Sequence, residues 1–190
     1  MYYAHLKQVF SPQWCENILH QAHFMGFEKA EVNNYGKLER LDHIRNNDKV
    51  QWDDTVLAHE VAQILQQNAG SIFPVNLNDL AYQETGSRFR IYRYEPGQYF
   101  KPHRDGHVSV NNLESQVTAL IYLNTPQGGE TILMPKGFAM KDWWIRIQPE
   151  MGDVLLFEHD FWHEGRPVIT GEKYVLRTDL FYEAPKPEPA

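Results

Sequence analysis

Apolar positions recur at helical spacing near the start of the chain, after a short expected strand that ends near Phe10. Ser11 followed by Pro12 is typical of a helix N-cap and first turn, and Gly26 marks the end of the pattern. Between them Ile18 and Ala22 fall on one face. The pattern predicts an amphipathic helix whose apolar face packs against the rest of the chain.

A second helix is predicted to begin at Asp53–Asp54, which supply an N-cap and a first-turn acid, and to end before Gly70. Its apolar positions share one face: Leu57, Val61, Ile64 and Leu65. The residues before it, Glu31 to Asp48, are polar and turn-rich. They predict a mobile loop with room for one short strand.

The second half of the chain changes to the period-two alternation of β-strands, punctuated by Pro and Gly. The predicted strands are Leu80–Gln83, Arg88–Tyr94, Val117–Leu123, Glu130–Leu133, Ile145–Gln148, Asp153–Phe157 and Lys173–Phe181. Many short antiparallel strands at this spacing favour a sandwich or jelly roll. We therefore expect a mostly β protein of the α+β class, with the N-terminal helices buttressing one sheet.

Composition narrows the class of protein. The 190 residues carry a formal net charge of 18 − 25 = −7, which argues against a nucleic-acid partner. The single cysteine, Cys15, excludes an intramolecular disulfide and a cysteine zinc cluster. No apolar run is long enough to cross a membrane and the N-terminus lacks a secretory pattern, so the expected location is cytoplasmic. One domain is expected over residues 1–183, followed by a disordered Pro-rich tail over residues 184–190.

A candidate metal site follows the predicted strand Arg88–Tyr94. His103 and Asp105 are two residues apart, so on an extended backbone their side chains point to the same side. One further histidine would complete the two-histidine, one-carboxylate face that holds Fe(II) and leaves positions open for other ligands. A zinc pair of His103 with His107 is disfavoured, because the neighbouring proline and glycine make a helix there improbable.

Two histidines close in sequence compete for the third position. His159 and His163 both follow the buried strand Asp153–Phe157. His163 is favoured because Gly165 and Pro167 place it at a turn near the start of the returning strand.

The last predicted strand carries charges on what should be an inward face. Lys173, Val175, Arg177 and Asp179 alternate along it and therefore share a side. Buried cations must be paired, and a dicarboxylate co-substrate would supply the countercharge. For Arg177 an ion pair with Asp179, or with a glutamate at the barrel wall, explains the charge equally well.

Taken together, these motifs resemble the Fe(II)/2-oxoglutarate-dependent oxygenases, and within them the prolyl 4-hydroxylase-like catalytic domain. The matching segments are Tyr94–Asp105 (Tyr-Glu-Pro-Gly-Gln-Tyr-Phe-Lys-Pro-His-x-Asp), Ile121–Asn124, Gly128–Thr131, Gly152–Phe157, and His163 followed by Pro167-Val168 and Gly171-x-Lys173. They occur in the family's order across about half of the chain. The combination is far more specific than any single motif.

The resemblance implies a double-stranded β-helix fold and a set of site residues. Its iron ligands would be His103, Asp105 and His163. Lys173 would pair with the far carboxylate of 2-oxoglutarate, Tyr122 would hydrogen-bond the same group, and Tyr94 would line the co-substrate pocket. The implied cofactors are Fe(II), 2-oxoglutarate as co-substrate, O2, and ascorbate as the reductant that restores oxidised iron.

One departure from the family affects the co-substrate. Arg177 stands where many relatives carry no charge, so its planar guanidinium could share the carboxylate with Lys173 or take it over. With Lys173 as the main cation, Lys173→Ala should raise the requirement for 2-oxoglutarate more than Arg177→Ala does.

The expected reaction is hydroxylation of an unactivated C–H, with release of succinate and CO2. The expected substrate is a peptidyl proline or related protein side chain, approached past candidate lids at Asn33–Val50 and His107–Ser115. Two alternatives stay open: an oxygenase of a free amino acid or other small metabolite, and a non-catalytic jelly-roll module that binds a metal or ligand. The sequence contains no signal for the oligomeric state.

Overall fold

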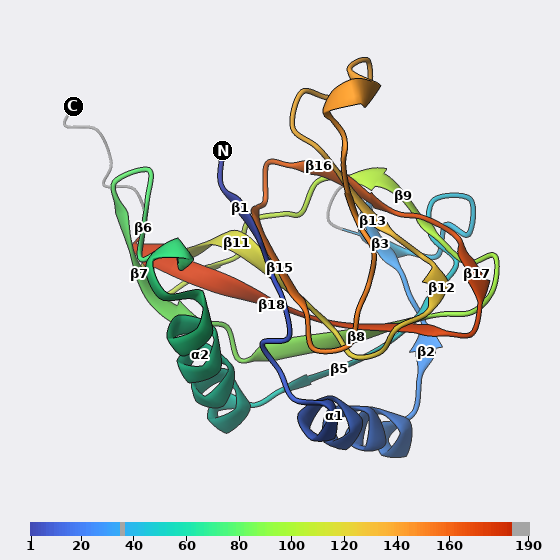
Figure 1. Ribbon diagram of the computed structural model, residues 1–190, viewed down its shortest axis with the longest axis horizontal. Helices are drawn as coiled ribbons and strands as arrows, with labels where there is room; N and C mark the ends of the chain where they lie inside the picture. Colours follow the sequence, from blue (N-terminus) through green and yellow to red (C-terminus); the bar gives the residue numbers. More distant parts are fainter. Residues whose placement is uncertain (35–36, 184–190) are drawn as a thin grey trace.

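Two antiparallel sheets face each other in the computed structural model, which describes residues 1–34 and 37–183 (Figure 1). The larger sheet runs in the order β1 (Tyr3–Leu6), β15 (Val154–Glu158), β11 (Leu113–Tyr122), β18 (Lys173–Glu183), β8 (Arg88–Tyr94), β5 (Asp48–Asp53), β2 (Glu28–Lys29). At its margins lie β10 (Ser109–Val110), β7 (Leu80–Thr85) and β6 (Asn76–Leu77). The smaller sheet runs β14 (Ile145–Ile147), β13 (Thr131–Met134), β16 (Trp162–Gly165), β9 (Phe100–His103). This is the expected jelly roll, or double-stranded β-helix.

Both helices cover the face of the larger sheet that points away from the smaller one (Figure 1). In α1 (Pro12–Met25) the Ser11 hydroxyl accepts the Trp14 backbone N–H at 3.2 Å. In α2 (Thr55–Ala69) the Asp54 carboxylate accepts the Leu57 N–H at 2.9 Å. The two predicted helices and their buttressing position are confirmed. Asp53 is not part of the second helix, because it ends β5.

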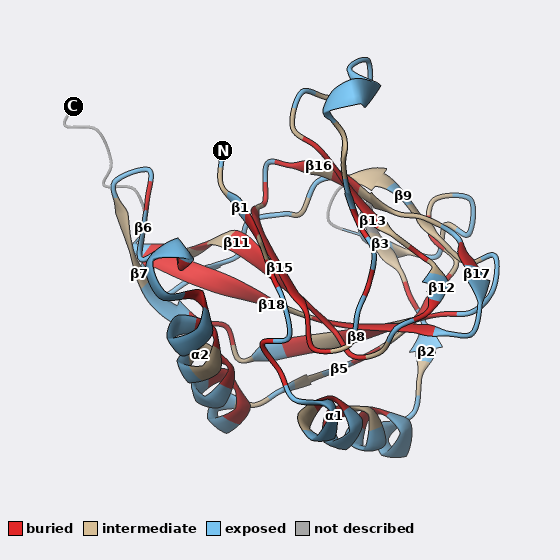
Figure 2. Ribbon diagram, viewed as in Figure 1, coloured by how far each residue is buried: buried red, intermediate tan, exposed pale blue. Residues whose placement is uncertain are grey.

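Alternation along two central strands divides the interior into two clusters. Phe89 and Ile91 of β8 pack against the helices, whereas Tyr92 and Tyr94 point between the two sheets. The same division in β18 sends Tyr174 and Leu176 to the helix side and Lys173, Val175 and Arg177 to the inner side. The predicted inward face of the last strand is therefore confirmed, and Figure 2 shows the central strands as the most buried part of the fold.

The region predicted as a mobile loop with one short strand contains more structure than expected. Strands β3 (Val32–Asn34) and β4 (Lys37–Glu39) pair with each other, and the region ends at β5, whose six residues pair with β8. The loop prediction is wrong here because strand pairing outweighs the polar local sequence. Tyr35 and Gly36 lie outside the described residues.

Several further strands were not predicted or have different bounds. The first strand ends at Leu6 and not near Phe10, and β11 begins at Leu113. The unpredicted strands include β9, β16, and the pair formed by β12 (Gln127–Gly128) and β17 (Val168–Thr170). Two short 3-10 helices are also present: η1 (Gly70–Ile72) follows α2, and η2 (Lys141–Trp143) precedes β14. The predicted tail 184–190 lies outside the described residues. Within the described ranges, no helix is both long enough and apolar enough to span a membrane.

Candidate metal centre and co-substrate pocket

Two neighbouring strands of the smaller sheet bring the predicted metal ligands together. His163 of β16 pairs directly with His103 at the end of β9, and their rings are 4.1 Å apart between centroids. Asp105 follows two residues later, with Oδ2 at 3.6 Å from His163 Nε2 and Oδ1 at 4.0 Å from His103 Nε2. One ligand atom from each of the three residues lies within 4.8 Å of the others. The convergence expected from the sequence is thus present.

Backbone carbonyls orient both imidazoles. Nδ1 of His103 donates to the Lys101 carbonyl at 2.8 Å, and Nδ1 of His163 donates to the Phe161 carbonyl at 3.0 Å. With the proton on Nδ1, the lone pair of each Nε2 points toward Asp105 and is free for a metal. Burial lowers the pKa of both histidines, which keeps them in the neutral form that a metal requires. This donor set fits Fe(II) in a two-histidine, one-carboxylate site.

Each oxygen of the Asp105 carboxylate is held by a different neighbour. Arg177 Nη1 donates to Oδ1 at 2.6 Å, and the Thr118 hydroxyl donates to Oδ2 at 2.6 Å. Burial would raise the pKa of Asp105, but the Arg177 guanidinium holds it well below its usual range. The carboxylate is therefore ionised and fixed in orientation.

Behind Thr118, His159 extends this hydrogen-bond chain and does not reach the metal position. Its Nδ1 lies 3.0 Å from the Thr118 hydroxyl and its Nε2 lies 3.0 Å from the Ser115 hydroxyl. Burial lowers the pKa of His159 to about 4, so its neutral ring accepts from Ser115 and donates to Thr118. Of the two candidate histidines, His163 therefore faces the other ligands and His159 supports one of them. His107 is bonded to the Ser115 carbonyl at 2.9 Å, away from His103.

Lys173 lies in the same cavity as the three ligands and is almost fully buried, with 3% of its surface exposed. Its amino group donates to the Gly129 carbonyl at 2.7 Å and to the Thr131 hydroxyl at 3.5 Å, both neutral oxygens. Burial lowers the pKa of Lys173 to about 7, and the Glu130 carboxylate opposes this shift. An external carboxylate would supply the charge partner that these contacts lack.

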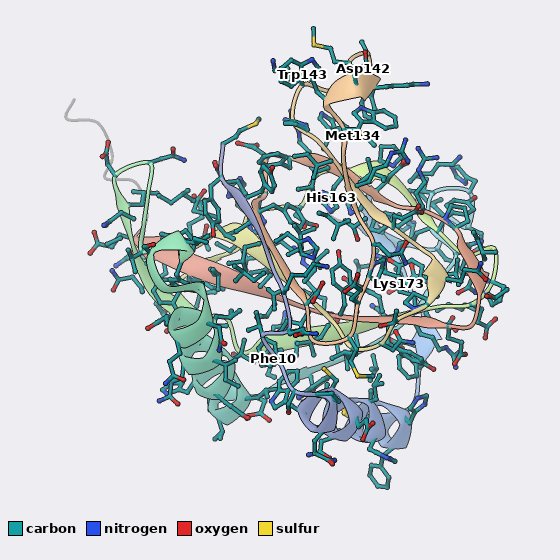
Figure 3. All side chains as sticks on the ribbon, viewed as in Figure 1. Phe10, Met134, Asp142, Trp143, His163 and Lys173 are labelled. Atoms are coloured by element: carbon teal, nitrogen blue, oxygen red, sulfur yellow. The ribbon has the colours of Figure 1, made fainter. Side chains whose placement is uncertain are left out.

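Two tyrosines form the walls around this amino group. The Lys173 Nζ lies 5.3 Å from the ring centroid of Tyr94 and 5.7 Å from that of Tyr122. The Tyr122 hydroxyl donates to Thr131 at 2.9 Å, and burial raises the pKa of Tyr94 to about 12. Tyr94 lines the cavity, as expected. Tyr122 is fully buried behind it and directs its phenolic hydrogen to Thr131, so the structure does not present it as a free donor to a carboxylate. Figure 3 shows Lys173 and His163 inside the fold.

Arg177 lines the cavity, but its guanidinium is already engaged. Besides Asp105 it contacts Asp179 Oδ1 at 3.0 Å through Nη2, and this pair is the alternative that the sequence left open. Burial opposes the charged form, while Asp105 and Asp179 raise the pKa of Arg177 above its usual range. Arg177 is therefore placed to orient the metal ligand Asp105, and not to bind the co-substrate as a second cation.

Three residues of the site were not singled out from the sequence. Thr118 and Thr131 hold Asp105 and Lys173, and Phe100 stacks on His103 with ring centroids 3.5 Å apart. For Phe100 the only signal was its position three residues before His103. Thr131 stands in the segment Gly128–Thr131, but the resemblance carried no role for it.

Comparison with known proteins agrees with this geometry. Residues 89–178 match the model of the 2OG-Fe(II) oxygenase superfamily. These 90 of the 190 residues, just under half of the chain, therefore resemble the 2OG-Fe(II) oxygenase superfamily. The match begins in β8 and ends in β18, so it contains all three candidate ligands and Lys173.

A plant protein resembles part of this chain in sequence. "Probable prolyl 4-hydroxylase 7" of Arabidopsis thaliana is 34% identical over 117 residues, which cover 48% of this chain and 37% of that protein. The chain thus spans less than half the length of this relative.

Solved structures share the fold across nearly the whole chain. The viral collagen prolyl hydroxylase of Paramecium Bursaria Chlorella virus-1, as its 2OG complex, has a TM-score of 0.65 at 20% identity and covers 98% of this chain and 97% of its own. A Trichoplax adhaerens prolyl hydroxylase bound to a hypoxia inducible factor peptide has a TM-score of 0.69 at 17% identity, covering 95% and 83%. At these identities the likeness establishes the fold alone, which is the double-stranded β-helix.

Proposed function

We propose that this protein is an Fe(II)- and 2-oxoglutarate-dependent dioxygenase that hydroxylates a peptidyl proline or a related protein side chain. The observation that carries the proposal is the joint placement of three ligands and one buried lysine in a single cavity. His103, Asp105 and His163 face one another there, and Lys173 lies in the same cavity beside neutral partners. A metal module without catalysis needs the ligands but not the buried cation.

Each residue has a defined task in this reaction. The two Nε2 atoms and the Asp105 carboxylate would hold Fe(II) on one face and leave the opposite face open. Lys173 would bind the far carboxylate of 2-oxoglutarate, Tyr94 would line its pocket and exclude water, and Tyr122 would hold the Thr131 hydroxyl beside Lys173. The bound iron, with 2-oxoglutarate and O2, supplies the oxidising chemistry: one oxygen atom enters the substrate C–H bond, the other enters succinate, and CO2 leaves. Ascorbate is the proposed reductant that maintains iron as Fe(II).

The proposed substrate class is supported by the relatives. The plant relative is named as a prolyl 4-hydroxylase, and the Trichoplax enzyme is seen with a peptide bound.

One assay tests the proposal and separates it from its alternatives. Succinate formation is measured with Fe(II) and 2-oxoglutarate, with and without a proline-rich peptide, and the peptide is analysed by mass spectrometry for an added oxygen atom. Peptide-stimulated turnover that is lost in His163→Ala supports the proposal. Stimulation by free amino acids alone would favour the small-metabolite oxygenase. If the wild type shows no turnover, or only a background turnover that is the same in His163→Ala, the binding module is favoured.

A further inference from the structure

Aromatic and basic side chains gather at one edge of the metal centre and are not used by the site described above. Residues 135–144, between β13 and β14, project beyond the smaller sheet (Figure 1). Figure 3 shows Trp143 on this projection, with His163 between it and Lys173 in the view. We call the following six side chains the rim surface: Arg104, Lys136, Phe138, Lys141, Trp143 and Trp162.

The rim surface lies at the strand ends that carry the metal ligands. Trp162 immediately precedes His163 and pairs across the sheet with Met134, the last residue before the projection. The Phe138 ring lies 4.8 Å from the Trp162 ring. Arg104, between the two ligands His103 and Asp105 in sequence, places its guanidinium 5.2 Å from the Trp162 centroid. Because neighbouring residues on a strand point to opposite faces, the side chains of Trp162 and Arg104 lie on the other face of the smaller sheet from the ligand side chains. A molecule bound on the rim surface therefore lies beside the strand ends that carry the ligands.

The apolar side chains of the projection are exposed although its backbone is ordered by hydrogen bonds. Phe138 is 46% exposed and Trp143 is 57% exposed. The Gly137 N–H donates to the Met134 carbonyl at 3.0 Å, and the Trp144 indole donates to the Gly137 carbonyl at 3.2 Å. Large aromatic side chains held in water on a fixed backbone are typical of a binding surface, because little ordering is needed when a partner covers them.

The charge of the rim surface is opposite to that of the whole chain. The chain carries a net charge of −7, whereas the rim surface contains three cations, and Asp142 is the single acid of residues 135–144. The Lys136 amino group lies 3.4 Å from the Trp143 centroid, and that of Lys141 lies 5.8 Å from the Trp144 centroid. Cations placed over rings in this way still present N–H groups to an approaching carboxylate. The surface therefore complements a partner that is both apolar and acidic.

The direction of approach to the cavity also points to this edge. The side chain of His103 is 20% exposed, whereas Lys173 at the co-substrate end is 3% exposed. The cavity is therefore more accessible at its His103 end, the end of the smaller sheet from which the rim surface projects, than at Lys173.

We propose that the rim surface binds the acidic flank of an extended, proline-containing peptide while its target residue reaches the metal centre. Proline-rich segments in an extended conformation dock on exposed aromatic rings, and flanking Asp or Glu residues would pair with Arg104, Lys136 and Lys141. The inference rests on the proposed function and narrows it to acidic, proline-containing substrates.

The test uses three peptides that share one target proline and differ only in its flanks, which are Glu, Gln or Lys. In the wild type, the KM should be lowest for the Glu peptide and should rise with salt concentration, because exposed charge pairs are screened. Phe138→Ala/Trp143→Ala should raise the KM for the Glu peptide about tenfold, with a smaller change in kcat. Lys136→Glu/Lys141→Glu should reverse the preference from the Glu peptide to the Lys peptide. A reversal cannot result from a general loss of folding.

Controls separate this inference from the proposed function. Phe24→Ala removes an aromatic ring that is 94% exposed on α1 and should leave all three KM values unchanged. If the wild type hydroxylates the peptides but the rim variants keep its KM values and its preference, the inference fails and the proposed function stands. If the wild type hydroxylates no peptide, both fail. A further outcome would also overturn the inference. If the wild type cosediments with phosphatidylcholine–phosphatidylserine vesicles, and Phe138→Ala/Trp143→Ala abolishes the cosedimentation while the peptide KM stays unchanged, the rim surface binds a membrane.

Discussion

At the residue scale, Lys173 and Arg177 are two cations of one strand face with different partners. Lys173 donates to the Gly129 carbonyl and the Thr131 hydroxyl, and so keeps its charge available for a ligand. Arg177 forms ion pairs with Asp105 and Asp179, so its charge is already neutralised by carboxylates of the protein. Because the two side chains have different partners although they are only four residues apart on the same face, substituting each in turn separates co-substrate binding from metal binding.

Substitution of the two cations should produce different defects. Lys173→Ala should raise the KM for 2-oxoglutarate more than Arg177→Ala does, because it removes the group that meets the far carboxylate. Arg177→Ala should weaken metal binding by about 10- to 100-fold, since it frees one oxygen of Asp105. The measurements are the KM for 2-oxoglutarate and the Kd for Mn(II) in place of Fe(II). The reverse ranking of the KM values would show that Arg177 is the anchor.

Lys173 should also make co-substrate binding depend on pH. Its pKa in the folded protein is about 7 against 10.5 for an ordinary lysine, so between these values the unfolded chain holds more protons. The free energy of unfolding of the ligand-free protein should therefore rise as pH increases from about 7 toward 10.5. A bound carboxylate favours the charged amino group and should draw in a proton.

Proton uptake can be measured by titration calorimetry of 2-oxoglutarate into the Mn(II)-loaded protein at pH 8, in buffers with different ionisation enthalpies. The expected uptake approaches one proton per molecule bound, because most of the lysine is neutral before binding. Lys173→Arg is the matched control, since arginine stays charged and should take up none. Equal uptake by both proteins would contradict the assignment.

At the scale of elements, the pairing of β16 with β9 places the two histidines opposite each other, and a turn before β15 holds the barrel to the N-terminal segment. The Gly152 carbonyl accepts the N–H groups of Val9 and Phe10 at 2.9 and 3.0 Å, and its own N–H donates to the Tyr122 carbonyl at 2.8 Å. Gly152 has a φ of +84°, which disfavours any side chain. The turn thus joins three separate segments of the chain through one residue.

Gly152→Ala should lower the free energy of unfolding by about 2–4 kcal/mol. The added Cβ would collide with the carbonyl oxygen of Phe10, in addition to the cost of a left-handed backbone. Gly171→Ala is the control: this glycine has a φ of +76° and no atom within 4 Å of the added Cβ, so about 1–2 kcal/mol is expected. Urea unfolding measures both values, and equal losses would show that the contact with Phe10 relaxes freely.

At the scale of the whole molecule, the helices, the larger sheet and the smaller sheet form three successive layers. The helices bury one face of the larger sheet, so its other face can carry polar residues such as Lys173 and Arg177 into the cavity. The metal ligands come from the smaller sheet and the loop that follows β9, while Lys173, Arg177 and Thr118 come from the larger sheet. The site therefore exists only when the two sheets are assembled.

Metal binding should stabilise the complete fold because the ligands are brought together only in the folded state. At a free Mn(II) concentration of 100 times Kd, the melting temperature should rise by roughly 5–10 °C. His163→Ala should abolish most of this rise, and a chelator should reverse it in the wild type. Phe24→Ala should keep the full rise, and the same rise in His163→Ala would show that the metal binds elsewhere.

The sequence by itself determined those features that depend on residues close together along the chain. The N-cap of Ser11, the alternation in β8 and β18, and the two-residue spacing of His103 and Asp105 each follow from neighbours within one element. These are short-range effects of backbone geometry and side-chain direction, so no knowledge of the tertiary fold is needed.

Only the tertiary structure decided which residues meet across the sheets. Local pattern favoured His163 over His159 but did not exclude the latter; the pairing of β16 with β9 sets His163 opposite His103 and leaves His159 bonded to Thr118. The unpredicted strands β9 and β16 have only four residues each, and they persist because neighbouring strands supply their hydrogen bonds. The sequence likewise left the partner of Arg177 undecided, because a cation on an inward face can pair with a bound ligand or with a carboxylate of the protein. The tertiary structure decides this, since it brings Asp105 to Arg177 from the opposite sheet.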